Sequence, residues 1–284
     1  MSSPLEKVVA LLDLEDIEVN IFRGVSPEED RQRVFGGQVA GQALVAATRT
    51  VEPERPVHSL HSYFIRPGDP KVPILYEVER LRDGRSFTTR RVVAIQHGKA
   101  IFNLQASFQV REQGLDFQIE MPEGVPAPED LPTFRERMAP HRHRFKDTKW
   151  IDEDKAIETR DVEDFTNRPK GSNTKMVWYR LNGDLPDDPI LHQCLLTYAS
   201  DMTLLDTIVV PHRLEWQWDD FQMASLDHAM WFHREFRLDD WFLYTQSTPS
   251  TGGSRGLALG SFFTRDGQLV CSVAQEGLVR VPRS

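Results

Sequence analysis

Residues 84–108 read GRSFTTRRVVAIQHGKAIFNLQASF, and residues 253–277 read GSRGLALGSFFTRDGQLVCSVAQEG. In each segment two apolar arms flank a short turn, His97-Gly98 in the first and Asp266-Gly267 in the second. A turn dipeptide with glycine between two such arms is typical of a β-hairpin. Each segment therefore predicts two antiparallel strands.

The surroundings of the two hairpins repeat as well. SYFIRP at 62–67 comes before the first hairpin, and MWFHRE at 230–235 comes before the second. Equivalent residues lie 168 or 169 positions apart: Phe64 and Phe232, Arg66 and Arg234, Ser86 and Ser254, Gly98 and Gly267. A near-constant offset of this kind indicates an internal duplication.

A nearly uncharged segment with helical character lies upstream of each hairpin, at 34–48 and at 190–205. In the second, apolar side chains recur at helical spacing and also occupy the other faces, as in a helix that is buried nearly all round. An antiparallel sheet curled around one central helix buries such a helix economically. The sequence therefore predicts an α+β fold made of two repeats, each with a long helix wrapped by an antiparallel β-sheet.

The middle of the chain differs from both repeats. Residues 112–148 contain five prolines and the basic cluster His141-Arg142-His143-Arg144. Proline at this density is typical of a connector and not of a core element. We expect a first repeat over 1–111, a Pro-rich connector over 112–148 and a second repeat over 149–284.

Composition excludes several classes of protein. The 284 residues are 39% hydrophobic and 27% charged, as in an ordinary globular protein, and carry a net charge of −9. An acidic chain is a poor match for nucleic acid or an anionic membrane, because phosphate is bound by clustered cations. Two cysteines do not make a disulfide framework, and neither a signal peptide nor a membrane-spanning segment is evident. We expect a soluble, cytoplasmic protein with no nucleic-acid or membrane partner.

Two polar residues lie where apolar ones are expected. Asp201 is the only Asp, Glu, Lys or Arg between Pro189 and Leu205, and it borders the apolar face of the predicted helix. A buried carboxylate is costly unless it is paired or hydrogen-bonded, so a functional acid and a solvent-reaching acid are equal alternatives. Gln275 alternates with apolar residues on one strand face, where its amide needs partners. A strand-end glutamine bonded to backbone is the alternative there.

Several long motifs in the same order resemble the acyl-CoA thioesterase II family. They are FRGVSPEEDRQRVFGGQVAGQALVAA, VHSLHSYFIRPGDP, LRDGRSFTTRRVVAIQHGKAIF, YASDMTLLD, LDHAMWFHR and VAQEGLVR. The resemblance covers almost the whole chain and implies a double hotdog fold. It also implies hydrolysis of fatty acyl-CoA to free fatty acid and CoA by a homo-oligomeric enzyme, without a metal or another cofactor.

The resemblance assigns roles to individual residues. YASD and VAQEG match the family motifs that carry a catalytic aspartate and glutamine, here Asp201 and Gln275, and Ser225 stands where the family has Thr or Ser. Asp201 is then the general base for a water molecule that Ser225 and Gln275 orient, and a thiolate leaves readily because the thiol has a pKa of about 8.5.

Further residues are candidates for binding the substrate. The predicted helix start at Gly36, Gly37 and Gln38 offers backbone N–H groups for the oxyanion, although the glycines fit close helix packing equally well. His58 is a candidate substrate-binding residue, with a structural histidine as the alternative.

Two other functions remain open. One is a hotdog hydratase or dehydratase acting on enoyl thioesters. Such enzymes pair a histidine with an acid, whereas Asp227 and His228 are neighbours in a predicted strand and face opposite sides. The other is a non-catalytic acyl-CoA binding protein. The G-x-S-x-G match at 252–256 lacks the following helix that a nucleophile elbow needs, and the histidines at 141 and 143 lack the neighbours of a metal site.

Overall fold

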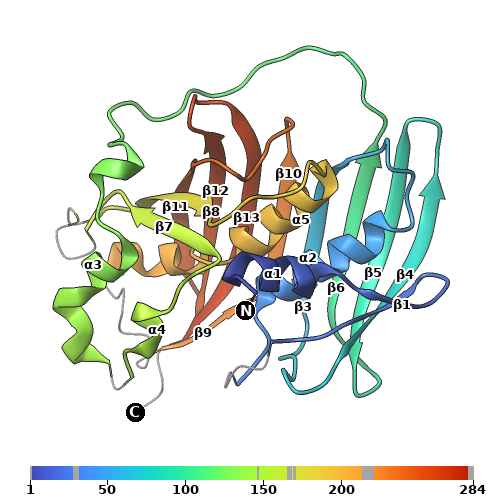
Figure 1. Ribbon diagram of the computed structural model, residues 1–284, viewed down its shortest axis with the longest axis horizontal. Helices are drawn as coiled ribbons and strands as arrows, with labels where there is room; N and C mark the ends of the chain where they lie inside the picture. The colour runs from blue at the N-terminus through green and yellow to red at the C-terminus, as the bar shows by residue number, and fades with distance from the viewer. Residues whose placement is uncertain are drawn as a thin grey trace.

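The computed structural model describes residues 2–27, 32–145, 147–164, 168, 171–212 and 221–280. Two helices, α2 and α5, lie against each other at the centre, and one curved sheet wraps around them (Figure 1). The helices are α1 Pro4–Leu12, α2 Gly36–Thr48, α3 Phe134–Met138, α4 Lys149–Asp152 and α5 Pro189–Ser200, with 3₁₀ turns η1 Pro128–Asp130, η2 Ala139–Arg144 and η3 Leu205–His212.

In the described part of the chain, 13 strands form one sheet. They are β1 Glu15–Glu18, β2 Ile21–Gly24, β3 Val57–Phe64, β4 Ile74–Asp83, β5 Phe87–Gln96, β6 Lys99–Gln109, β7 Ile157–Asp161, β8 Thr174–Leu181, β9 Gln222–Ser225, β10 Asp227–Phe232, β11 Phe242–Gly252, β12 Arg255–Thr264 and β13 Leu269–Arg280. Their order is β1-β2-β4-β5-β6-β3-β10-β13-β12-β11-β8-β7, and the short β9 also pairs with β13.

The middle of the sheet carries the signature of the duplication. There β3 pairs with β10 in antiparallel fashion, with His61 directly opposite Ala229. These two residues lie 168 positions apart, which is the offset that separates the equivalent residues of the two repeats. The strands on either side follow in matching order, β6-β5-β4-β2-β1 on one side and β13-β12-β11-β8-β7 on the other. The protein is therefore a double hotdog, as the sequence predicts.

The two repeats share one core. A single cluster of buried apolar side chains includes Ala43 and Leu44 of α2, Leu195 of α5, and strand residues from both repeats. The small residues of α2 bring the helices into close contact: a methyl group at Gly37 would lie 2.3 Å from the carbonyl oxygen of Tyr198. Close approach of the two helix backbones thus depends on this glycine.

The second central helix is shorter than the sequence predicts. It ends at Ser200 and not near residue 205, and Asp201 occupies its C-cap position. The hydroxyl of Thr197 donates to the carbonyl oxygen of Gln193 one turn back (2.9 Å), a side-chain bond that slightly weakens and often bends a helix. The chain then turns and continues as η3. Asp201 therefore lies at the end of a helix and not within one.

The two predicted hairpin turns differ. His97 and Gly98 both have positive φ and close a tight turn between β5 and β6, as expected. Asp266-Gly267 lies instead in a longer loop, where Thr264 and Gln268 are the bonded ends. A tight turn joins β11 and β12 at Gly253 and Ser254, both with positive φ. The G-x-S-x-G match is therefore a hairpin and not a nucleophile elbow.

The segment between the repeats begins as an extended chain. Residues 110–127 contain no helix or strand and cross the top of the molecule in Figure 1, from the end of β6 toward η1 and α3. The chain is held against the second repeat by Gln118, which donates to the carbonyl of Gly267 (2.8 Å) and accepts from the N–H of Leu269 (3.1 Å). In the described residues no helix is long and apolar enough to cross a membrane.

Candidate active site

Asp201 is held between the two central helices. As the C-cap of α5 it faces the first turn of α2, and its residue is only 9% exposed. The backbone N–H of Gly37 donates to its carboxylate. A methyl group at Gly36 would lie 2.6 Å from Oδ2 of Asp201, so only glycine leaves room for the carboxylate at this point. The end of one repeat's helix thus meets the start of the other's.

Ser225 and Gln275 complete a closed set of hydrogen bonds with Asp201. Nε2 of Gln275 donates to Oδ1 of Asp201 (2.9 Å) and to Oγ of Ser225 (2.7 Å). The Ser225 hydroxyl in turn lies 3.4 Å from the same carboxylate oxygen, to which it donates. Ser225 ends β9, and Gln275 lies where β13 changes its partner from β10 to β9. Three elements of the second repeat therefore bring these side chains together.

Burial and hydrogen bonding act on the Asp201 carboxylate in opposite directions. Removal from water raises its pKa above the ordinary value and is the largest influence. The hydrogen bonds from Gln275, Gly37 and Ser225 lower it, but less than burial raises it. The result is a carboxylate that is more basic than one in water and is held in one position. This combination suits a general base.

His228 is part of the same network, although it was not among the predicted site residues. Its ring is buried, with Nδ1 2.7 Å from Oε1 of Gln275 and Nε2 2.8 Å from Oγ of Ser200. Burial lowers its pKa, so the ring is neutral at pH 7. The signal was present in the alternation of β10, since His228 shares its buried face with Met230 and Phe232. A histidine on that face needs partners.

Asp227 turns away from His228, as strand alternation predicts. Its Oδ1 accepts a hydrogen bond from the backbone N–H of Glu276 (2.7 Å), whereas His228 points to Gln275. The adjacent acid and histidine therefore do not face one point. A hydratase of this fold would need them to converge.

The remaining predicted residues lie in different places. Gly36 and Gly37 border the Asp201 carboxylate, as described above. The side chain of Gln38 instead donates to the carbonyl of Val25 (3.1 Å) and to the hydroxyl of Ser26 (3.0 Å), and so holds the loop before α2. His58 lies on β3 with Nε2 2.8 Å from Oγ of Ser107. Its hydrogen bond and its ring contact with Phe87 are made outside the Asp201 cluster.

Neither cysteine has the setting of a nucleophile. Cys194 and Cys271 are both free and buried, and burial raises the pKa of each thiol. Among the residues that the structure describes, no group of three His, Cys, Asp or Glu side chains is placed to hold a metal ion.

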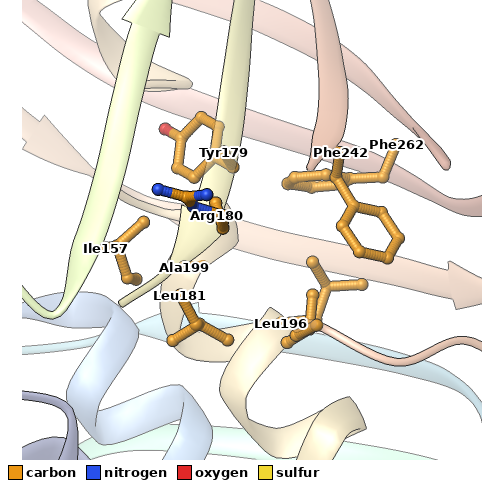
Figure 2. Close-up of a pocket in the computed structure, with 9 residues that line it drawn as sticks. Ile157, Tyr179, Arg180, Leu181, Leu196, Ala199, Phe242 and Phe262 are labelled. Carbon is orange, nitrogen blue, oxygen red and sulfur yellow. The ribbon is translucent and has the colours of Figure 1, made fainter. Parts of the chain in front are cut away.

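The core beneath the end of α5 is tightly packed. Leu196 and Ala199 of α5 line a cavity of only about 10 Å³ together with Phe242 and Phe262, and Figure 2 shows Leu196 on the side of the two aromatic rings. The hydroxyl of Tyr179 points away from this cavity and lies 2.7 Å from Oγ1 of Thr203. A far larger cleft, of about 1010 Å³, lies at the other end of the helix pair, where α1, the end of α2 and the start of α5 meet. Asp201, Ser225 and Gln275 do not line it.

Comparisons with known proteins point to one family. Residues 149–278 match the family model described as acyl-CoA thioesterase, and residues 26–109 match the acyl-CoA thioesterase N-terminal domain. The chain is 42% identical to acyl-coenzyme A thioesterase 8 of Mus musculus, over 96% of this chain and 89% of that protein. It is 39% identical to acyl-CoA thioesterase 2 of Haemophilus influenzae, over 99% of both chains.

A solved structure shows that the similarity in sequence extends to the fold. The crystal structure of the acyl-CoA thioesterase II TesB2 from Mycobacterium marinum superimposes with a TM-score of 0.82 at 46% identity, covering 97% of this chain and 98% of that one. The likeness in fold thus extends over nearly the whole length of both chains. The chain therefore belongs to the acyl-CoA thioesterase family, whose members are thioester hydrolases.

Proposed function

We propose that this protein hydrolyses fatty acyl-CoA thioesters to free fatty acid and CoA, with Asp201, Ser225 and Gln275 activating a water molecule. The observation that carries the proposal is the buried Asp201 carboxylate, bonded to Gln275 and Ser225 and facing the first turn of α2. The family membership of the chain and the names of its relatives support the choice of substrate.

In the proposed reaction the water oxygen attacks the thioester carbonyl carbon while its proton passes to Asp201. The carbonyl π electrons move onto oxygen to give a tetrahedral oxyanion. Collapse of this intermediate breaks the C–S bond and releases the CoA thiolate, which takes up a proton from Asp201 or from solvent. No covalent bond to the enzyme forms at any stage.

The first turn of α2 is the proposed oxyanion site. The first N–H groups of a helix lack partners within it and favour negative charge. Gly37 already gives its N–H to Asp201, so we assign the oxyanion to the N–H groups of Gly36 and Gln38.

Release of free thiol from palmitoyl-CoA tests the proposed reaction. We expect steady thiol release without added metal, and no change in conjugated absorbance when an enoyl-CoA is supplied with water alone. Hydration of the enoyl-CoA without thiol release would identify a hydratase. Tight binding of acyl-CoA with neither reaction would identify a binding protein. Either of these two outcomes would contradict the proposal.

The dependence of kcat/KM on pH is a second expectation. Asp201 acts only when ionised, and burial raises its pKa above the value of about 3.9 for an aspartate in water. Activity should therefore fall as the pH is lowered through this raised pKa, with the acid limb of the profile clearly above pH ~4. A stopped assay at pH 4–9 with controls for reversible inactivation measures the limb. A limb at the ordinary aspartate pKa would show that the base lies elsewhere.

We further propose that the protein self-associates and works in the cytoplasm, in fatty acid metabolism. Exposed aromatic residues on the outer face of the central strands support self-association: Tyr63 of β3 is 60% exposed, and Trp231 of β10 is 37% exposed. Light scattering of the purified protein should give a mass that is a multiple of 32.7 kDa. A single-chain mass at micromolar concentration would overturn this part of the proposal.

A further inference from the structure

We propose that His228 is a positioning residue, which holds the amide of Gln275 in the one orientation that serves Asp201 and Ser225. This inference rests on the proposed function, because it concerns the same reaction. It assigns to His228 no contact with the substrate and no proton transfer during the reaction.

The Gln275 amide has two ends that must not be exchanged. Its N–H₂ group faces two oxygens, Oδ1 of Asp201 at 2.9 Å and Oγ of Ser225 at 2.7 Å. A half-turn of the amide would place Oε1 against the carboxylate oxygen and remove the donor that both partners use. His228 opposes this turn, because the N–H on Nδ1 donates to Oε1 at 2.7 Å. The opposite orientation would set two donors against each other.

The histidine is itself fixed in the matching tautomer. The buried ring is neutral and carries one N–H, which the contact with Oε1 of Gln275 places on Nδ1. Nε2 is then an acceptor, so the Ser200 hydroxyl, 2.8 Å from Nε2 and 2.9 Å from the carbonyl oxygen of Thr197, gives its one proton to the ring. The hydroxyl of Ser62 also donates to the backbone carbonyl of His228 at 2.7 Å. A continuous chain of bonds thus runs from Ser200 through the ring and the amide to Asp201.

In the first repeat, apolar residues stand at the positions equivalent to His228 and Gln275. The residue 168 positions before His228 is Leu60, and the residue 169 positions before Gln275 is Ala106. Leu60 and Ala106 are direct partners across β3 and β6, and both are fully buried. The fold therefore accepts an apolar pair at this position. The polar pair occurs in the repeat that holds the buried carboxylate, which ties His228 to the reaction and not to the stability of the sheet.

Two amide variants distinguish the contributions of the two ring nitrogens of His228. His228→Asn can place an amide N–H where Nδ1 lies and so keeps the donor to Gln275. His228→Gln places its amide near the position of Nε2 and loses that donor. We expect His228→Asn to keep kcat within about 5-fold of the parent, and His228→Gln to lower kcat by about 10- to 100-fold with KM little changed. Palmitoyl-CoA hydrolysis, followed by free-thiol release from folded protein, measures both.

The combination with Gln275→Ala shows whether His228 acts through the amide. In that background we expect His228→Gln to change kcat by less than about 3-fold, because the group it positions is absent. Equal losses in His228→Asn and His228→Gln, or losses that multiply with that of Gln275→Ala, would overturn the inference while leaving the proposed function intact. A near-normal kcat for Gln275→Ala alone would overturn both. Should His228→Gln not fold, Ser200→Ala provides the second test, with kcat lowered several-fold and KM unchanged if the ring must be held.

Discussion

Asp201→Asn should lower kcat for palmitoyl-CoA by about 10³-fold, since a positioned general base contributes roughly 10²- to 10⁴-fold. The substitution keeps the size of the side chain and an oxygen that can accept from Gln275 and Ser225, but it removes the basic carboxylate. KM should change little, because the same volume is filled. The rate of free-thiol release from saturating palmitoyl-CoA measures the effect.

The same variant should be at least as stable as the parent at pH 7. Burial raises the pKa of Asp201 in the folded protein above its value in the unfolded chain. The ionised group therefore destabilises the folded state at every pH above the folded pKa, and this penalty disappears below the unfolded value near pH ~3.9. Asparagine removes the penalty, so the midpoint of thermal unfolding at pH 7 should stay the same or rise. Reduced activity together with retained stability distinguishes loss of a base from loss of structure.

Asp206 is a matched control for this experiment. It lies five residues further along the chain, burial raises its pKa to about 6, and Nζ of Lys175 lies 3.8 Å from its carboxylate. Asp206→Asn therefore also neutralises a carboxyl whose pKa burial raises, but one outside the proposed set. We expect its kcat to remain within a few-fold of the parent. Comparable losses in the two variants, or a near-normal rate for Asp201→Asn, would contradict the assignment of Asp201 as the base.

The fold could be predicted because the duplication places matching residues at a constant distance along the chain. The offset of 168 between matching residues reappears as the strand register of His61 and Ala229 at the centre of the sheet. Two uncharged helices and two sets of hairpins leave few other ways to bury the helices. The end of α5 was not predictable in this way, because apolar periodicity continues past Ser200 into η3 and the hydroxyl bond of Thr197 near the helix end has no periodic signal.

The site could be predicted only in part, for a related reason. Asp201 and Gln275 are polar residues in apolar surroundings, and the sequence shows this directly. His228 lies on the buried face of β10, but its partners come from α5 and β13, which only the fold brings together. The role of Gly37 was left open between close packing and anion binding, and the structure supports packing against Tyr198 together with donation to Asp201.

Gly37→Ala should destabilise the protein by about 3 kcal/mol, the upper part of the range for an overpacked core. The added methyl group would lie 2.3 Å from the carbonyl oxygen of Tyr198, and backbone cannot move aside as a flexible side chain can. The gain of about 1 kcal/mol in helix propensity from glycine to alanine does not offset this clash. Urea unfolding monitored by tryptophan fluorescence measures the change.

Gly41→Ala, one turn further along the same face of α2, is the control that isolates the close approach. Its methyl group would lie 3.1 Å from Leu12, 3.3 Å from the carbonyl oxygen of Cys194 and 3.5 Å from Tyr198, so small shifts accommodate it. We expect a change in stability within about 1 kcal/mol and little loss of kcat. Gly37→Ala should instead lose kcat as well, because separation of the helices moves the N–H of Gly37 away from Asp201. Equal stability of Gly37→Ala and Gly41→Ala would mean that α2 and α5 tolerate separation. The contact of Gly37 with Tyr198 would then not set the position of the Asp201 carboxylate.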